Sequence, residues 1–184
     1  MVKFEDLPEI LAAKEIVKVY KYTKNNLPVD IWMIMRGKSI IVKEVDLPNE
    51  ISGVLDTRGS QPIVLIQGKH DDKRKRFSLA HELGHYILDS SMRGVHLDKH
   101  TFFRSNLSSS GTNLEEKKAN RFAAELLMPS DILWEILSGR EMPDFIDSQE
   151  AEGIAALTEL AEKFEVSVAA LTIKISGVLR GKGF

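Results

Sequence analysis

Two histidines and a glutamate stand close together in the stretch RKRFSLAHELGHYILDS, in which HELGH occupies residues 81 to 85. An α-helix turns about 100° per residue, so side chains four positions apart lie on the same face. His81 and His85 would therefore project together, and each could give one ring nitrogen to a tetrahedral Zn²⁺. Glu82 is rotated away from this row and could take a proton from a water molecule held by the metal. The spacing predicts metal-assisted hydrolysis.

The five-residue pattern also has a simpler interpretation, because it is short enough to arise by chance and buried histidines are often only hydrogen-bonded. Its surroundings favour a functional site. Phe77, Ala80, Gly84 and Leu88 lie on or beside the stripe of the two histidines, which directs that face to the interior. Because glycine costs a helix interior about 1 kcal/mol relative to alanine, Gly84 indicates that some group approaches the helix backbone closely.

A catalytic zinc needs three protein ligands and one open position. The chain has no cysteine, so the third ligand must be His, Asp or Glu. The downstream candidates are His96, His100, Glu115 and Glu116. We expect both histidines in a polar, irregular segment at the surface, with substrate contact as their minor alternative.

Glu116 is the third ligand that the apolar stripe of LEEKKANRFAAELLMP favours, because the stripe reaches it when extended back by one turn. A carboxylate on the core face of a helix is expensive unless it is paired or bound to metal. Glu115 lies about 100° away, toward solvent. Capping boxes offer another explanation, since Thr112 with Glu115 and Asn113 with Glu116 both have the required spacing. We favour the first register, which leaves Glu116 free for metal.

The composition narrows the class of protein. The chain has 184 residues, of which 43% are hydrophobic, which is enough for one domain or one domain with a small appendage. A net charge of -2 gives no strong attraction to nucleic acid or membrane. The start, MVKFEDLPEI, lacks the pattern of a signal peptide, and no apolar run approaches the roughly 20 residues that cross a bilayer. We therefore expect a soluble, cytoplasmic protein.

The elements that must position these residues change character along the chain. Helical spacing extends over residues 7–26 and 27–37, with Pro28 in the first turn of the second helix and Gly37 at its end. Short β-branched strands are predicted next, at 38–48, 51–57 and 61–68. Further helices are predicted at 74–88, 114–129, 130–139, 149–163 and 167–180, with a polar loop at 105–113. Helices, then a small sheet, then helices indicate an α+β fold.

The combination of RKRFSLAHELGHYIL with EEKKANRFAAELLMP resembles the ImmA/IrrE family of bacterial metallo-endopeptidases. ISGVLD and QPIVLIQGK are similar to that family's sheet region, and the resemblance covers about residues 28 to 180. It implies a minimal zincin core of the thermolysin-like, or gluzincin, type. Such a core has a small β-sheet, the HExxH helix and a second helix that supplies a glutamate. The N- and C-terminal helices would be additions to this core.

The resemblance also implies roles for individual residues. His81, His85 and Glu116 would hold Zn²⁺, or Mn²⁺ in its place, and Glu82 would be the general base. Asn120 stands four residues after the glutamate ligand, where the gluzincin pattern commonly has Asp or Asn, and would orient a ligand histidine. The family often has an acidic residue at the position of Lys118, but this departure lies off the ligand row.

The implied activity is a zinc-dependent endopeptidase that cleaves a bacterial or phage-type helix-turn-helix transcriptional repressor. Such cleavage would regulate stress-response or mobile-element genes. The alternative is a non-catalytic regulatory module, or a toxin–antitoxin component, that binds a repressor-like partner. Glu82 argues against the alternative, because a purely structural metal site has no need of a base. No membrane partner is expected.

The C-terminal helices raise a separate question. We expect a zincin-like metallopeptidase domain over 1–145 and a helix-turn-helix-like pair over 146–184, packed on it as one structural unit. Ser167 would cap the second helix of the pair. Reading DNA requires side chains that contact bases and phosphates, and the stretch VSVAALTIKISG of this helix offers only Lys174, with Thr172 and Ser176. Packing on the core is therefore favoured, and direct DNA binding is not expected.

Overall fold

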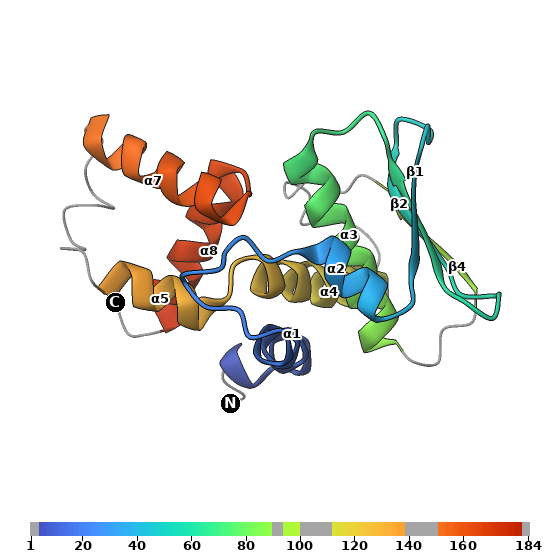
Figure 1. The fold of residues 1–184 in the computed structure, drawn as a ribbon, viewed down its shortest axis with the longest axis horizontal. Helices are drawn as coiled ribbons and strands as arrows, with labels where there is room; N and C mark the ends of the chain where they lie inside the picture. The colour runs from blue at the N-terminus through green and yellow to red at the C-terminus, as the bar shows by residue number, and fades with distance from the viewer. Residues whose placement is uncertain (1–3, 90–93, 100–111, 139–150, 182–184) are drawn as a thin grey trace. The chain divides into compact units, whose positions relative to one another are not determined.

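The computed structural model describes residues 4–89, 94–99, 112–138 and 151–181. The chain divides into two compact units (Figure 1). One unit is Asp30–Ala123, and the other combines Met1–Val29 with Ala124–Phe184. The boundary predicted after residue 145 falls among residues outside the described ranges, so it stays a prediction.

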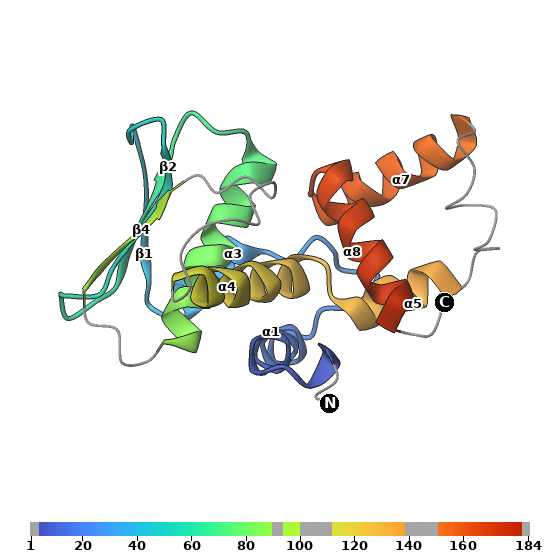
Figure 2. The same ribbon diagram turned by 180° about the vertical axis from the view of Figure 1, so that it is seen from behind.

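The first unit contains the HELGH segment and a four-stranded sheet. Its elements are α2 (Ile31–Gly37), β1 (Ile41–Val45), β2 (Ile51–Asp56), β3 (Ile63–Gln67), α3 (Asp72–Leu88), β4 (Val95–Lys99) and the first part of α4 (Thr112–Leu127). The strand order is β1-β3-β2-β4, in which β1 is parallel to β3 and the other pairs are antiparallel. Figures 1 and 2 place α2 and α3 on the same face of this sheet.

The register of the sheet determines which side chains meet the helices. Leu55 of β2 is opposite Val64 of β3 and His96 of β4, so these three side chains share one row on one face. Leu55 and Val64 are fully buried, which identifies this face as the one that packs on the helices. His96 therefore points to the interior of the unit, although it belongs to a polar sequence.

Local signals at the helix ends explain where the helices begin. Asp71 accepts a hydrogen bond from the backbone N–H of Arg74 at 2.9 Å, so α3 begins at Asp72, two residues before the predicted start. Asp30 accepts from the backbone N–H of Met33 at 2.8 Å and caps α2. The prediction that Pro28 lies in the first turn of α2 is wrong, because this cap starts the helix at Ile31.

The second unit is helical in its described part. It contains η1 (Phe4–Asp6), α1 (Pro8–Val19), the last residues of α4, α5 (Ser130–Ser138), α7 (Ala151–Phe164) and α8 (Val168–Gly181). The turn between α7 and α8 includes Glu165 at φ 51°. Ser167 accepts from the backbone N–H of Ala170 at 3.2 Å, which confirms the predicted cap. Together the units confirm the α+β class, and no helix of the described residues is long and apolar enough to span a membrane.

A buried ion pair joins α4 to α8 within the helical unit. Glu125 is fully buried and accepts from the Lys174 ammonium, from Ser130 Oγ at 2.6 Å and from the Ser130 backbone N–H at 3.0 Å. Lys174 is only 9% exposed. Lys174, the cation that the stretch VSVAALTIKISG offers for a phosphate contact, is thus engaged inside the unit.

Candidate metal centre

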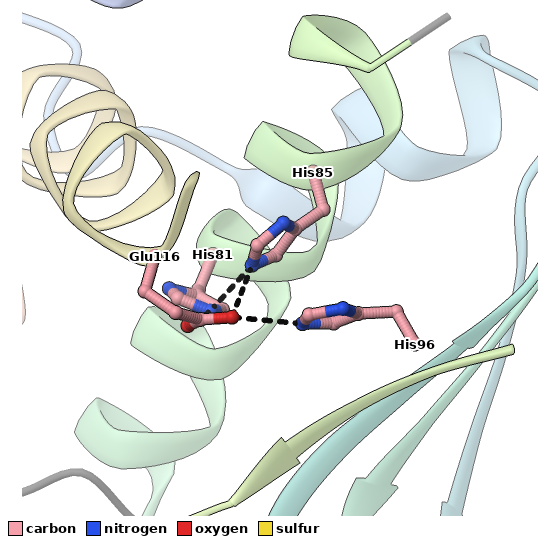
Figure 3. A group of neighbouring side chains, drawn as sticks. All are labelled: His81, His85, His96 and Glu116. Carbon is pink, nitrogen blue, oxygen red and sulfur yellow. Dashed lines mark hydrogen bonds and ion pairs between the residues drawn. The ribbon is translucent and has the colours of Figure 1, made fainter. Parts of the chain in front are cut away.

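His81 and His85 lie side by side on α3, as their spacing predicts. Both side chains are buried, and their Nε2 atoms are 3.0 Å apart. Figure 3 shows the two rings directed to one point between α3 and α4. The helix therefore presents two imidazole nitrogens together in the interior of the sheet-containing unit.

Glu116 reaches these histidines from α4. Its Oε2 atom is 3.2 Å from His81 Nε2, and its Oε1 atom is 3.4 Å from His85 Nε2. The neighbouring Glu115 is exposed, as the apolar stripe predicts. The side chains of Thr112 and Asn113 lie outside the described part, so neither capping register is tested.

Gly84 explains how α4 comes close enough. A Cβ atom at this position would stand 3.0 Å from Phe122 Cδ1 and 3.1 Å from Ala119 Cα. Any larger residue would push the two helices apart and withdraw Glu116 from the histidines. The close approach predicted from this glycine is confirmed, and the approaching group is the backbone of α4.

His96 corrects a prediction. The sequence places it in an irregular surface segment, whereas the structure places it in β4 with its ring directed to the same point (Figure 3). Its Nε2 atom is 3.2 Å from Glu116 Oε1, and its ring centroid is 3.8 Å from that of His85. His100 and residues 105–111 lie outside the described ranges.

Asn120 determines the state of the His81 ring. Asn120 Oδ1 is 3.0 Å from His81 Nδ1, and since an amide oxygen only accepts, Nδ1 must carry the proton. A neutral His81 then presents an unprotonated Nε2 to the oxygens of Glu116. Lone pairs that face one another in this way need a proton or a metal cation between them.

The distances fit a metal cation. Donors bound to zinc at 2.0–2.1 Å in a tetrahedron stand about 3.3 to 3.4 Å from one another. Glu116 Oε1 is 3.4 Å from His85 Nε2 and 3.2 Å from His96 Nε2, Glu116 Oε2 is 3.2 Å from His81 Nε2, and the Nε2 atoms of His81 and His85 are 3.0 Å apart. One ligand atom from each of these four residues lies within 4.8 Å of every other. The donor set, three imidazoles and one carboxylate, is suited to a divalent transition metal.

The charge of Glu116 is already favoured without a metal. Burial acts to raise its pKa, but the close contacts with the rings of His81, His85 and His96 outweigh burial and hold the pKa well below its usual range. The carboxylate is therefore ionised over the physiological pH range and available as a ligand.

Glu82 differs from the other acids of the site. Its side chain is 0% exposed, and neither carboxylate oxygen has a hydrogen-bond partner among the described residues. Burial raises its pKa to about 8, against the opposing charge of His81. It occupies space left by Gly53 of β2, where a Cβ atom would stand 2.5 Å from Glu82 Oε1. A buried acid without partners, beside a group of metal-binding side chains, is typical of a catalytic base.

Gly53 and Asp98 lie at this site without any signal in the sequence, and His96, although a candidate third ligand, was expected at the surface. Asp98 follows two residues after His96 on the same face of β4 and pairs with Gly53 in the register. Burial raises the pKa of Asp98, and the negative charge of Glu116 adds to this rise. The alternation of VHLDK is a possible strand signal, but it has its apolar residues outside and its polar residues inside.

Comparison with known proteins gives a consistent result. The Peptidase M78 model, described as the IrrE N-terminal-like domain, matches residues 37–176. The radiation response metalloprotease IrrE of Deinococcus radiodurans is 32% identical over 117 residues, which cover 58% of this chain and 33% of that protein. The chain thus spans about a third of the length of this curated relative.

A solved structure shares the fold. A chain described as a Mycobacterium tuberculosis transcriptional regulator superimposes with a TM-score of 0.56 at 16% sequence identity. The match covers 89% of the present chain and 45% of the other. At this identity the likeness concerns the fold alone.

Proposed function

This chain belongs to the Peptidase M78 family of IrrE N-terminal-like domains, and from that premise we propose that it is a zinc-dependent endopeptidase. The observation that carries the proposal is the buried, unpartnered carboxylate of Glu82 beside the converging donors of His81, His85 and Glu116. These three residues would hold the metal, as zinc sites with three protein ligands do in hydrolases. Manganese is an alternative ion for the same donors.

The roles of the residues follow from their positions. A bound zinc ion would polarise the scissile carbonyl and lower the pKa of the attacking water. Glu82 takes the proton from that water at a carboxylate oxygen and then gives it to the nitrogen of the leaving amine. Its burial suits this exchange, because a carboxyl with a raised pKa accepts and returns a proton near neutral pH.

Asn120 acts through His81 and is a positioning residue. Its amide oxygen accepts the Nδ1 proton, which fixes the tautomer and directs the Nε2 lone pair toward the metal position. Loss of the hydrogen bond between Asn120 and His81 would therefore lower the metal affinity, although all the ligands would remain.

We further propose that the substrate is a helix-turn-helix transcriptional repressor and that the protein acts in the cytoplasm on stress-response or mobile-element genes. The support is the resemblance to the ImmA/IrrE family, and the name of the curated relative, a radiation response metalloprotease, agrees with it. Direct DNA binding is not part of the proposal, because Lys174 is paired with Glu125 inside the helical unit.

A second candidate function is a non-catalytic module, or toxin–antitoxin component, that docks a repressor-like partner. One observation favours it: His96 brings a fourth donor to the centre, and four protein ligands are typical of structural zinc sites. The orphaned carboxylate of Glu82 favours the peptidase, because a structural site gains nothing from an unpaired buried acid.

Glu82→Gln separates the two functions. It keeps the size of the side chain and removes its basicity, so cleavage should fall by roughly 10²–10⁴-fold while zinc content is retained. The Glu82→Gln variant would first capture the partner from a lysate. The captured protein would then be incubated separately with zinc-loaded wild type and with the zinc-loaded variant, and its mass would be measured over time. Glu115→Gln, an exposed change on α4, is the matched control and should cleave like wild type.

The results have distinct meanings. Equal cleavage by wild type and Glu82→Gln would show that Glu82 is not the base. Stable binding by both proteins with no cleavage by either would favour the docking module.

A further inference from the structure

A metal centre that hydrolyses a bond keeps one coordination position for an external ligand. His81, His85 and Glu116 would leave such a position. His96 projects into the same space from β4, on the side opposite to the two helices (Figure 3). The question is whether this fourth donor is an accidental neighbour or belongs to the centre.

The contacts of His96 match those of the other donors. Its Nε2 atom stands 3.2 Å from Glu116 Oε1, the same distance that separates His81 Nε2 from Glu116 Oε2. Despite this distance, His96 Nε2 is buried and makes no hydrogen bond of acceptable geometry within the described chain. An imidazole nitrogen that is close to a carboxylate, dry and poorly aligned for hydrogen bonding is placed as a metal donor would be.

The sheet fixes this placement. His96 pairs with Leu55, and its neighbours Val95 and Leu97 are 42% and 47% exposed. Successive side chains of a strand alternate between faces, so the register that directs His96 inward requires these two apolar residues to face outward. Exposing two apolar side chains while burying a histidine is unfavourable unless the buried ring has a partner.

The strand that carries His96 lies at one edge of the sheet, as β1 does at the other edge. Within the described residues β4 is hydrogen-bonded to β2 alone, whereas β2 and β3 each lie between two strands. Its register with β2 shifts between Ile51 and Gly53, which interrupts the ladder beside Asp98. A displacement of β4 would break one ladder and leave α3, Glu116 and the remaining strands in place.

We propose that His96 is a fourth protein ligand that closes the metal centre at rest, and that β4 must withdraw it before an external ligand can bind. The inference rests on the proposed metallopeptidase function and adds a resting, closed state to it. A substrate or partner that engages β4 would open the centre, so that activity is coupled to recognition.

The test uses the full chain loaded with Co²⁺, whose visible absorption reports its ligands, and acetohydroxamate as an external ligand. His96→Ala should weaken metal binding, measured by chelator competition, by about tenfold or more, the loss typical of removing even an outer partner of a metal site. It should also bind acetohydroxamate more tightly than wild type, because one position is now open. Leu97→Ala changes the outward face of the same strand and should leave both measurements unchanged.

His96→Gln is a second variant, with a polar side chain of similar length. It controls for a loss of metal affinity that is caused by misfolding. The same two changes in His96→Gln, with wild-type thermal stability of its metal-free form, would support the closed centre. Metal affinity and acetohydroxamate binding equal to wild type in both His96 variants would overturn it, even if the protein proves to be a peptidase. If the wild type cleaves no partner but His96→Ala still loses metal affinity and gains acetohydroxamate binding, the ligand assignment stands and the peptidase proposal fails.

Discussion

Helix α4 carries two inward-facing carboxylates with opposite environments. Glu125 is fully buried, and its oxygens receive hydrogen bonds from the ammonium of Lys174 and from the hydroxyl and backbone N–H of Ser130. Glu116 is 26% exposed at its side chain, and it contacts the rings of His81, His85 and His96 at 3.2 to 3.4 Å. One helix thus supplies one acid to each unit of the chain.

The difference lies in the partners. Lysine is charged at every physiological pH, so Glu125 is neutralised by the chain itself and requires nothing from outside. Histidine is neutral over much of that range, and a neutral ring that faces a carboxylate with its lone pair offers no compensation. A buried carboxylate that is paired with a lysine stabilises the packing of its helices. A carboxylate that is surrounded by neutral imidazoles can instead bind a cation.

Replacing Glu116 and Glu125 one at a time should produce the largest difference between them, measured as bound zinc. Glu116→Ala should reduce bound zinc from about one ion per chain to a small fraction, because it removes the carboxylate of the donor set and leaves only neutral imidazoles. Glu125→Gln should keep its zinc, because glutamine has the shape of glutamate and residue 125 lies in the helical unit, which contains none of the proposed metal ligands. Elemental analysis after dialysis measures both. Full zinc occupancy in Glu116→Ala would remove Glu116 from the ligand set.

The next largest effect concerns stability. Lys174→Met leaves the charge of Glu125 buried without its cation, which typically costs about 3–5 kcal/mol of the free energy of unfolding. The metal content of the folded fraction should stay at the wild-type level. Urea titration followed by circular dichroism gives the free energy, with the exposed Lys163→Met as the control.

Adding Glu125→Leu to Lys174→Met sharpens this result. The double variant buries no charge, and replacing a whole buried pair by apolar residues is often neutral or stabilising. It should therefore recover most of the loss. A double variant less stable than Lys174→Met would show that the serine contacts of Glu125, rather than its charge balance, stabilise this region.

Glu82 provides a pH-dependent effect in the metal-free protein. Its pKa is raised from 4.5 to about 8 in the folded state, so folding favours the protonated form. The stability associated with this proton is complete below pH 4.5 and is lost as the pH rises to about 8. Glu82→Gln lacks this loss and should become more stable than wild type by about 1 kcal/mol per pH unit across that window.

Thermal unfolding in the presence of EDTA at pH 5 and pH 8 measures this effect. The two proteins should have similar stability at pH 5 and differ at pH 8. A constant difference at both values would show that the carboxyl of Glu82 keeps an ordinary pKa in the folded protein.

The smallest expected effect belongs to Asn120. Asn120→Ala removes the acceptor of His81 Nδ1 but no ligand, so zinc affinity should fall by about 10–100-fold. Asn120→Asp keeps an oxygen acceptor and should restore most of the affinity. Competition with a chromophoric chelator measures all three proteins. Equal affinity in wild type and Asn120→Ala would leave Asn120 with no part in orienting the ring.

Sequence reasoning succeeds here where one local period determines the geometry. The histidines of HELGH and the inward orientation of Glu116 follow from helical spacing, and Gly84 indicated the contact with α4. Each of these depends on residues within one helix. The α+β class follows from the order of such segments in the same way.

The parts that were missed depend on pairing over long distances. His96 meets Glu116 because β4 pairs with β2, which places His96 opposite Leu55, 41 positions earlier in the chain. The apolar residues Val95 and Leu97 of β4 face outward. Prediction from periodicity assumes that apolar residues face the core, so β4 was predicted to be an irregular surface segment. The Glu125–Lys174 pair spans 49 residues and is equally invisible to local patterns.

Gly53 has a consequence for how this chain can vary. Its φ is not in the left-handed region, so the restriction at this position comes from Glu82, which fills the volume of the missing side chain. The carboxylate is the more mobile of the two, so a methyl group at Gly53 would displace Glu82 while sparing the strand. Gly53→Ala would thus abolish catalysis by Glu82 and leave a protein that still folds and binds metal.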